Sequence, residues 1–366
     1  MYFTISSVGD NTVFKFTNYG LSYSIDDGDT WNTLNANEFI ELPYGKRALF
    51  KGELIPTNNG IGTFSCNGLF SVKGNIMSLL YGDNYEGQTD LTGKDYAFKR
   101  LFRGCANLMD IKELKLPAII LSKECYAEMF WAAMSIEETP ELPATVLAES
   151  CYSNMFYNCS SLKTINKINA TELAKSCCEG MFRECRKLEN VPSLNATILT
   201  ERCYCNMFMS CSKLTVPPEI KATSLAKECC MNMFSYCNKL LYSPSLYATT
   251  LVDKCYKEMF KECTNLQRIE ALFITTPSSE YTDNWVSGVY NNGVFIKNEN
   301  AQWSVYGNEG IPTNWNIIYR DKFNYLTFTA LEDSYFKFLG NDIKYSIDNG
   351  STWITLEDGN YSPEIK

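Results

Sequence analysis

The stretch that decides the fold is LPATVLAESCYSNMFYNCSSLKTI, residues 142–165, because its pattern recurs along the middle of the chain every 26 residues. Each unit holds a cysteine and a Met-Phe pair at constant spacing, followed by a second cysteine and a leucine except in the unit of Cys125, which has Ala133 and Ile136 there. The first cysteines are Cys125, Cys151, Cys177, Cys203, Cys229 and Cys255, and the second are Cys159, Cys185, Cys211, Cys237 and Cys263. A fixed period of this length is typical of a solenoid, in which each unit packs on its neighbours.

Two periodicities follow one another within each unit. Leu147, Cys151 and Met155 lie at i, i+4 and i+8, which predicts a helix of about three turns. Leu162 and Ile165 predict a short extended segment after it. We therefore expect an α/β solenoid with one helix and one short parallel strand per repeat.

The cysteines are expected to be free, buried and metal-free. Neighbouring helices lie about 8–10 Å apart, whereas a disulfide needs Cα atoms within about 7 Å, so equivalent cysteines should not pair. A zinc site is disfavoured because the chain lacks CxxC spacing, and Cys203 and Cys205 or the adjacent Cys177 and Cys178 are poorly spaced as ligands. No cofactor or metal is predicted.

The repeats resemble a known family. CYSNMFYNCSSL (151–162), CYCNMFMSCSKL (203–214) and CYKEMFKECTNL (255–266) are similar to BspA-type leucine-rich repeats, although the unit is longer and has Met-Phe where Ala-Phe is usual. The resemblance covers about residues 100–273. It implies a right-handed α/β leucine-rich-repeat solenoid of the kind found in surface and adhesive proteins of Bacteroidetes. Similar proteins are encoded by phages of these bacteria, including crAss-like gut phages. The family has no common catalytic residue to carry over.

The two ends of the chain repeat each other. Residues 14–34 and 336–356 align at a constant offset of 322, and both contain S-x-D-x-G-x-T-W, which resembles the structural Asp-box of sialidase-type propellers. The positions are Ser24, Asp26, Gly28, Thr30 and Trp31, then Ser346, Asp348, Gly350, Thr352 and Trp353. The motif predicts a hairpin in which the aspartate binds backbone amides, the glycine takes φ > 0 and the tryptophan packs beneath. Two isolated copies do not make a propeller, and a calcium site at Asp26, Asp27 and Asp29 lacks EF-hand spacing.

These patterns divide the chain into five parts. We predict a β module with an Asp-box-like hairpin at 1–62, an N-terminal cap at 63–100, the repeat solenoid at 101–273, a β-rich C-terminal cap or neck at 274–320, and a second β module at 321–366. The second module has no counterpart of the strand in 41–52, so either the chain continues beyond Lys366 or a neighbouring chain completes that sheet. Trp285, Trp303 and Trp315 could form a carbohydrate platform, but core packing is the favoured interpretation.

Composition excludes several functions. The 366 residues contain 33 Lys+Arg and 42 Asp+Glu, a net charge of −9 without a basic block, which argues against nucleic-acid binding. No apolar run is long enough to span a membrane. The absence of histidine excludes Ser-His-Asp and Cys-His catalysis and histidine-ligated metals. MYFTISSVGDNTVFKF (1–16) predicts a strand and not a signal peptide.

The function expected from these observations is non-enzymatic. The leading hypothesis is a phage virion fibre or decoration protein that presents a repeat surface for host attachment, with other virion proteins and a host cell-surface protein or glycan as partners and a homotrimer as the expected assembly. Free thiols suit folding in a reducing cytosol. The alternatives are an exported adhesin of the bacterial cell surface, a purely structural spacer and, remotely, a glycan-active enzyme, for which no pair of carboxylates stands out.

A partner is expected on the strand side of the repeats, where the sequence varies most. The variable segments are KTINK (163–167), ENVPS (189–193), TVPPE (215–219), LYSPS (241–245) and QRIEA (267–271). Variation there could equally reflect solvent exposure alone. The candidate contact residues are Lys163, Lys167, Glu189, Glu219, Tyr242 and Arg268.

Overall fold

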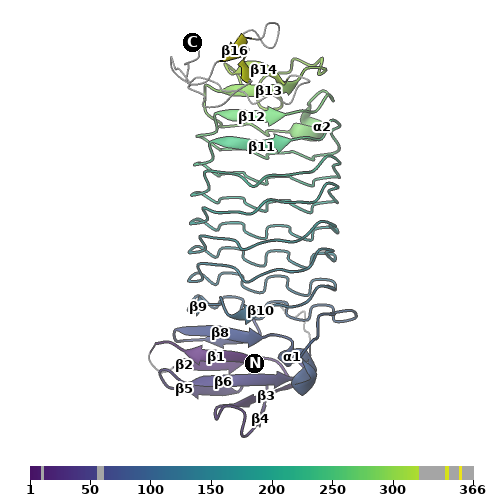
Figure 1. Ribbon diagram of the computed structural model, residues 1–366. Coiled ribbons are helices and arrows are strands. Elements are labelled where there is room, and N and C mark those ends of the chain that lie inside the picture. The colour runs from purple at the N-terminus through teal and green to yellow at the C-terminus, as the bar shows by residue number, and fades with distance from the viewer. Residues whose placement is uncertain (10–11, 56–61, 321–342, 346–353, 357–366) are drawn as a thin grey trace. The chain divides into compact units, whose positions relative to one another are not determined.

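A computed structural model describes residues 1–9, 12–55, 62–320, 343–345 and 354–356. The chain forms two compact units, residues 1–318 and residues 319–366. The first unit begins with a β module, continues through a stack of repeats and ends in a parallel sheet (Figure 1).

The N-terminal β module contains two sheets. One has the strand order β10-β8-β1-β6-β3-β4, with β9 also paired to β8, and the other has the order β5-β2-β7. The strands are β1 (Phe3–Ser7), β2 (Thr12–Phe16), β3 (Leu21–Ser24), β4 (Asn32–Leu34), β5 (Phe39–Leu42), β6 (Arg47–Gly52), β7 (Phe64–Cys66), β8 (Phe70–Asn75), β9 (Leu108–Asp110) and β10 (Leu114–Lys115). The strands predicted at the start of the chain and within 41–52 are confirmed.

Phenylalanines fill the space between the two sheets. Phe3 of β1 contacts Phe64 of β7 at 6.2 Å between ring centroids, and Phe14 of β2 meets Phe70 of β8 edge-on at 5.2 Å. All four rings are buried. Alternation of buried and outward residues along β2 and β8 places these rings on one face.

Strand β8 joins the module to the repeats. It pairs antiparallel with β1 on one side and parallel with β9 and β10, which belong to the first repeat, on the other. The short helix α1 (Ser78–Tyr81) and the 3-10 helix η1 (Gly82–Asn84) follow it. The segment predicted as a cap, 63–100, thus shares its sheets with the β module and also pairs with the first repeat.

The repeats stack in parallel, which confirms the predicted solenoid. Isolated bridges join residues 26 positions apart, such as Leu142 to Ile168, Val146 to Glu172 and Ile198 to Ser224. In the later repeats, pairing extends into the four-stranded sheet β11-β12-β13-β14, in which β11, β12 and β13 pair in parallel. These strands are β11 (Tyr242–Leu246), β12 (Arg268–Ala271), β13 (Val294–Asn298) and β14 (Asn316–Arg320).

The helix predicted for each repeat is wrong. Residues 122–133 and their equivalents 26 residues apart, here called the turn wall, form consecutive turns, and the only helix in the described residues after 101 is α2 (Ser279–Thr282). The N–H of Tyr152 donates to Cys177 O and that of Phe156 to Met181 O, both at 2.9 Å, so alternate amides bond to the next repeat. Intervening amides bond three residues back, and Ser150 has φ +52°, which an α-helix does not contain.

The parallel strands explain this difference. Strand pairing sets a rise of ~4.8 Å per repeat, whereas stacked helices need about 8–10 Å. A repeat with a strand on one side and a helix on the other would have different rises on its two sides, and the stack would curve strongly. A turn wall that bonds to the next repeat has the smaller rise, which matches that of the strands. The expectation that equivalent cysteines lie about 8–10 Å apart, which assumed neighbouring helices, is therefore also wrong.

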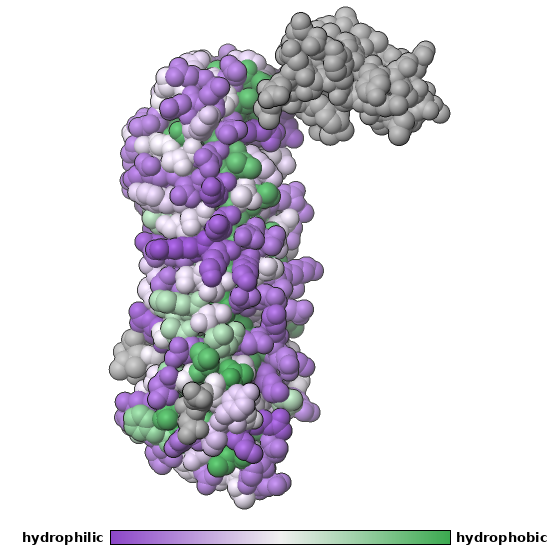
Figure 2. Space-filling model, turned by 90° about the vertical axis from the view of Figure 1, so that its left-hand side faces the viewer, coloured by the Kyte–Doolittle hydropathy of each residue, from purple (hydrophilic) through white to green (hydrophobic). Residues whose placement is uncertain are grey.

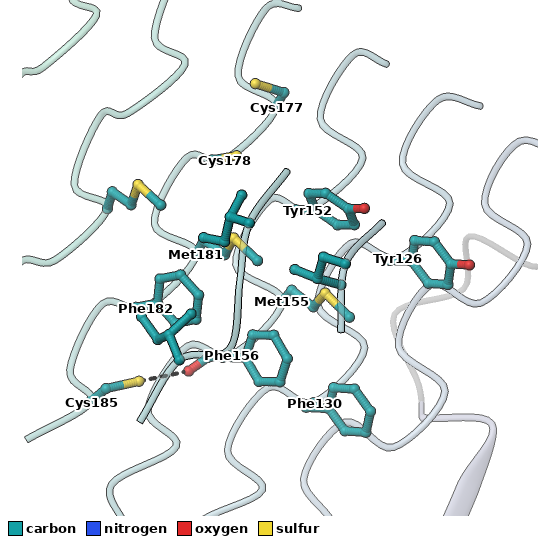
Figure 3. Close-up of a cluster of buried hydrophobic side chains, with 14 of the residues drawn as sticks. Tyr126, Phe130, Tyr152, Met155, Phe156, Cys177, Cys178, Met181, Phe182 and Cys185 are labelled. Atoms are coloured by element: carbon teal, nitrogen blue, oxygen red, sulfur yellow. Dashed lines mark hydrogen bonds between the residues drawn. The ribbon is translucent and has the colours of Figure 1, made fainter. Parts of the chain in front are cut away.

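A stack of phenylalanine rings runs through the repeats. From Phe102 to Phe260, equivalent rings lie 5.3–5.8 Å apart between centroids and nearly parallel. Phe64 of the β module stacks on Phe102 at 5.7 Å, and Trp285 contacts Phe260 at 5.9 Å. Figure 3 shows Phe130, Phe156 and Phe182 following one another with Met155 and Met181 beside them. The stack continues from the β module to the last repeats.

The second cysteine of each repeat has a bonding role in this core. Its thiol donates to the carbonyl of the phenylalanine of the preceding repeat, as Cys185 does to Phe156 O at 3.1 Å (Figure 3). The same bond recurs at Cys159, Cys211, Cys237 and Cys263. A small side chain that can both pack and donate suits this position.

The tryptophans near the end of the first unit are core residues, as favoured by the sequence. Trp285 is fully buried, and Trp303 and Trp315 are each 5% exposed. Trp303 stacks on Phe273 at 5.2 Å, and its indole N–H donates to Phe273 O. Rings packed in this way cannot serve as a carbohydrate platform.

The hairpin predicted from S-x-D-x-G-x-T-W forms between β3 and β4. Asp26 accepts a hydrogen bond from the Thr30 N–H at 3.0 Å, Gly28 has φ +101°, and the Trp31 indole donates to Gly28 O. The bonds to Asp26 from the Ser24 hydroxyl, the Thr30 hydroxyl and the Thr30 N–H lower its pKa to about 2.

In the second unit, β15 (Ile343–Tyr345) and β16 (Ile354–Leu356) pair antiparallel. Ile343 pairs with Leu356 just as Leu21 pairs with Leu34, so the two copies share one register at an offset of 322. The second motif, Ser346 to Trp353, lies outside the described residues.

Candidate interaction face

The strand wall comprises residues 163–168 and their equivalents in the other repeats, opposite the turn wall. Five of its six predicted contact residues are exposed and Tyr242 is half-buried. Figure 2 shows one side of the molecule, on which hydrophilic side chains cover most of the surface and hydrophobic ones occur in separate patches. This side therefore offers polar contacts more than a continuous apolar face.

Several predicted residues are already paired within the wall. Lys163 donates to Glu137 of the preceding repeat at 2.8 Å, and this bond lowers the pKa of Glu137. Glu219 lies 4.0 Å from Lys221. Exposed pairs of this kind stabilise little but reduce the charge available to a partner.

Tyr242 and Arg268 lie side by side at the start of β11 and β12. Arg268 contacts Glu270 at 3.5 Å, and the Ser245 hydroxyl donates to the same Glu270 oxygen at 2.7 Å. This network fixes a buried carboxylate beside the arginine. Lys167, in contrast, is exposed and forms no ion pair within the described residues.

Glu189 is the predicted residue that lies in a groove. The groove is lined by Glu189, Asn190, Val191, Lys213, Thr215, Val216 and Lys239 from three successive repeats. Val216 is 48% exposed. Lys213 and Lys239 were not predicted, although both lie in the constant 26-residue register.

Interrupted pairing between repeats accompanies the groove. In the preceding repeat the amides of Glu189 and Asn190 donate to Lys163 O, and the amide of Ile165 donates to Asn190 O. One repeat later the equivalent amides, those of Thr215, Val216 and Val191, have no partner among the described residues. Pro217 and Pro218 follow directly. Because proline has no N–H and restricts the residue before it, the parallel ladder is disturbed here.

Two columns of charged residues show how charge is arranged along the repeats. The alternating column is Lys123, Glu149, Lys175, Glu201, Lys227 and Asp253, whose ion pairs are 2.9 to 3.1 Å long. The lysine column is Lys187, Lys213 and Lys239, all exposed and without an ion pair within the described residues. The sequence carried this signal, because each column can be read at the 26-residue period.

The thiols offer little chemistry. All sixteen cysteines are free and all except the half-buried Cys66 are buried. Burial raises the pKa of Cys125, Cys237 and Cys255 to about 12, so the thiolate is disfavoured. The described residues contain no group of three or more Cys, Asp or Glu side chains arranged to hold a metal ion.

Within the described part of the chain, neither helix has the length and apolar character that crossing a bilayer requires. Comparison with protein-family models, with curated proteins and with solved structures finds no match. The candidate interaction face is thus defined by the geometry of this chain alone.

Proposed function

We propose that this chain is a non-enzymatic structural and interaction protein of a bacteriophage particle, a fibre or decoration that presents its strand wall to the host surface. The observation that carries the proposal is the repeat stack itself. Phenylalanine rings and backbone bonds link every repeat to the next, while the strand wall changes its exposed side chains from repeat to repeat. A stiff support with a variable surface suits recognition at a distance from the particle.

The thiols support the phage assignment. Sixteen free thiols, most of them buried in the core, favour synthesis and folding in a reducing compartment. Virion proteins fold and assemble in the host cytosol before lysis. The resemblance of the repeats to BspA-type leucine-rich repeats, found in surface proteins of Bacteroidetes and in their phages, belongs to the same proposal.

Assembly as a homotrimer with other virion proteins is also part of the proposal. In the N-terminal β module, β4 and β5 each lie at the end of a sheet in the described residues, and open edges are natural assembly contacts. The host partner would be a cell-surface protein or glycan that contacts the strand wall.

Quantitative proteomics of purified virions beside the host envelope fraction tests the proposal. We expect the chain to be enriched in virions with the other particle proteins. Its presence in the envelope fraction alone would end the phage assignment and leave a bacterial surface adhesin.

Thiol labelling tests the cytosolic folding step. Protein purified without reductant should be alkylated at all sixteen cysteines once unfolded, and in the native state at Cys66 before any other, although burial raises the pKa of Cys66 to about 11. Disulfide-linked peptides from adjacent repeats would contradict it.

A further inference from the structure

We propose that the groove between residues 189–191 and 213–216 binds a polysaccharide chain that carries carboxylate groups. This proposal rests on the interaction role proposed above and names the class of its ligand. The argument begins with the lysine column, Lys187, Lys213 and Lys239, two of whose members line the groove.

The three stacked lysines form no ion pair within the described residues, and they repel one another modestly because all three are exposed to water. One repeat separates neighbours, a rise of ~4.8 Å, and like charges directly opposite one another on a sheet are destabilising. The alternating column shows that the same repeats neutralise charge elsewhere by placing a carboxylate after each lysine. The lysine column lacks carboxylates in a chain whose net charge is −9. An anionic ligand would supply the missing countercharge.

The groove beside the lysines provides further donors. The amides of Val191, Thr215 and Val216 have no partner among the described residues, because the ladder is interrupted before Pro217. These amides belong to residues that line the groove together with Lys213 and Lys239, so the groove is rich in donors that suit carboxylate oxygens.

The remaining lining residues favour a sugar over other anions. Glu189 and Asn190 can accept hydrogen bonds from hydroxyl groups, and Val191 and Val216 can contact the C–H face of a sugar ring. The groove contains no aromatic ring on which a base could stack, which disfavours a single-stranded nucleic acid. The rise between Lys213 and Lys239 is comparable with the length of one sugar unit.

The test uses the full chain and a defined probe, the hexamer of α-1,4-linked galacturonic acid, titrated calorimetrically at low salt. The hexamer with all carboxylates methyl-esterified is the matched neutral probe. We expect the acidic hexamer to bind and the ester not to bind. The double variant Lys213→Gln/Lys239→Gln should weaken binding about two- to thirtyfold, since two exposed charge pairs are lost.

The control variant is Lys46→Gln/Lys115→Gln, which removes two exposed lysines outside the groove that form no ion pair in the described residues. Its affinity should equal that of the unmodified chain. Equal weakening in both double variants, full affinity in Lys213→Gln/Lys239→Gln, binding of the neutral ester, or no binding of the acidic hexamer would overturn the proposal. Equal affinity for a single-stranded oligothymidylate would overturn the assignment to a sugar.

These outcomes are independent of the virion test. A chain that is enriched in virions but does not bind the hexamer would refute the ligand and keep the phage assignment. A chain that binds the hexamer but occurs only in the envelope would keep the groove and refute the phage assignment.

Discussion

The turn wall and the strand wall of the same repeats differ in how regularly each repeat contacts the next. In the turn wall, alternate amides bond to the next repeat and the phenylalanine rings stack without interruption from Phe102 to Phe260. In the strand wall, pairing is continuous between β12 and β13 but interrupted around Pro217, and exposed charges differ from repeat to repeat. Stability is thus concentrated on one side of the stack, which leaves the other free to vary and to bind.

Truncation of the phenylalanine stack should have the largest effect. Phe182 is fully buried and stacks on Phe156 at 5.6 Å and on Phe208 at 5.8 Å. Phe182→Ala should lower the free energy of unfolding by about 3–5 kcal/mol, because it removes buried area and leaves a cavity. Urea denaturation followed by circular dichroism measures this change.

The matched control is Val216→Ala on the strand wall. Val216 is 48% exposed, so its truncation should change the free energy of unfolding by less than about 0.5 kcal/mol. Equal losses in the two variants would mean that both walls stabilise the stack alike.

A smaller effect, of opposite sign, is expected at Tyr126 in the turn wall. Within the described part of the chain its hydroxyl is buried without a hydrogen-bond partner, and burial raises the pKa of this phenol well above its usual value. Tyr126→Phe removes an unsatisfied polar atom and should raise the free energy of unfolding by about 1 kcal/mol. Tyr157→Phe should instead be destabilising, since its hydroxyl donates to Glu184 at 2.9 Å. Destabilisation by both changes would show that the Tyr126 hydroxyl is bonded in solution.

A still smaller effect separates the two charge columns. Glu201→Lys places a lysine between Lys175 and Lys227, the two ammonium groups that lower the pKa of Glu201, and should lower the denaturation midpoint. Lys213→Glu places a carboxylate within the lysine column and should leave the midpoint unchanged or raise it slightly. Both shifts should shrink in about 1 M NaCl, where exposed charges are screened. A salt-independent loss in Glu201→Lys would point to packing instead of charge.

The smallest effect concerns the hairpin of the β module. Because the folded-state pKa of Asp26 is lowered to about 2, its ionised form stabilises the hairpin fully above its unfolded pKa. This stabilisation should be lost as the pH falls from about 4 to about 2. NMR titration of the Thr30 amide, which donates to Asp26, should follow the loss. In the variant Asp26→Asn, the chemical shift of the Thr30 amide should not change with pH in this range. If it still did, the titration would belong to another carboxyl group.

Much of the architecture could be predicted from the sequence. The period from Cys125 to Cys255 predicted the stack, the Met-Phe pairs predicted its core, and the offset of 322 predicted the shared hairpin register. The candidate face was predicted only as a set of variable positions. Lys213 and Lys239 lie outside these variable segments and repeat at the 26-residue period, so variation between repeats does not identify them.

What the sequence determined by itself is periodicity, because a 26-residue repeat places like residues above one another whatever the local conformation. The tertiary structure decided that conformation. The pattern Leu147, Cys151 and Met155 fits a helix as well as it fits the observed turns. In a helix, however, the amides bond within the same helix, and neighbouring helices lie about 8–10 Å apart. Bonds from Tyr152 and Phe156 to the next repeat exist only in the stack, at the rise that the parallel strands impose. The groove before Pro217 also depends on the tertiary structure, because it accompanies an interruption of backbone pairing between two neighbouring repeats.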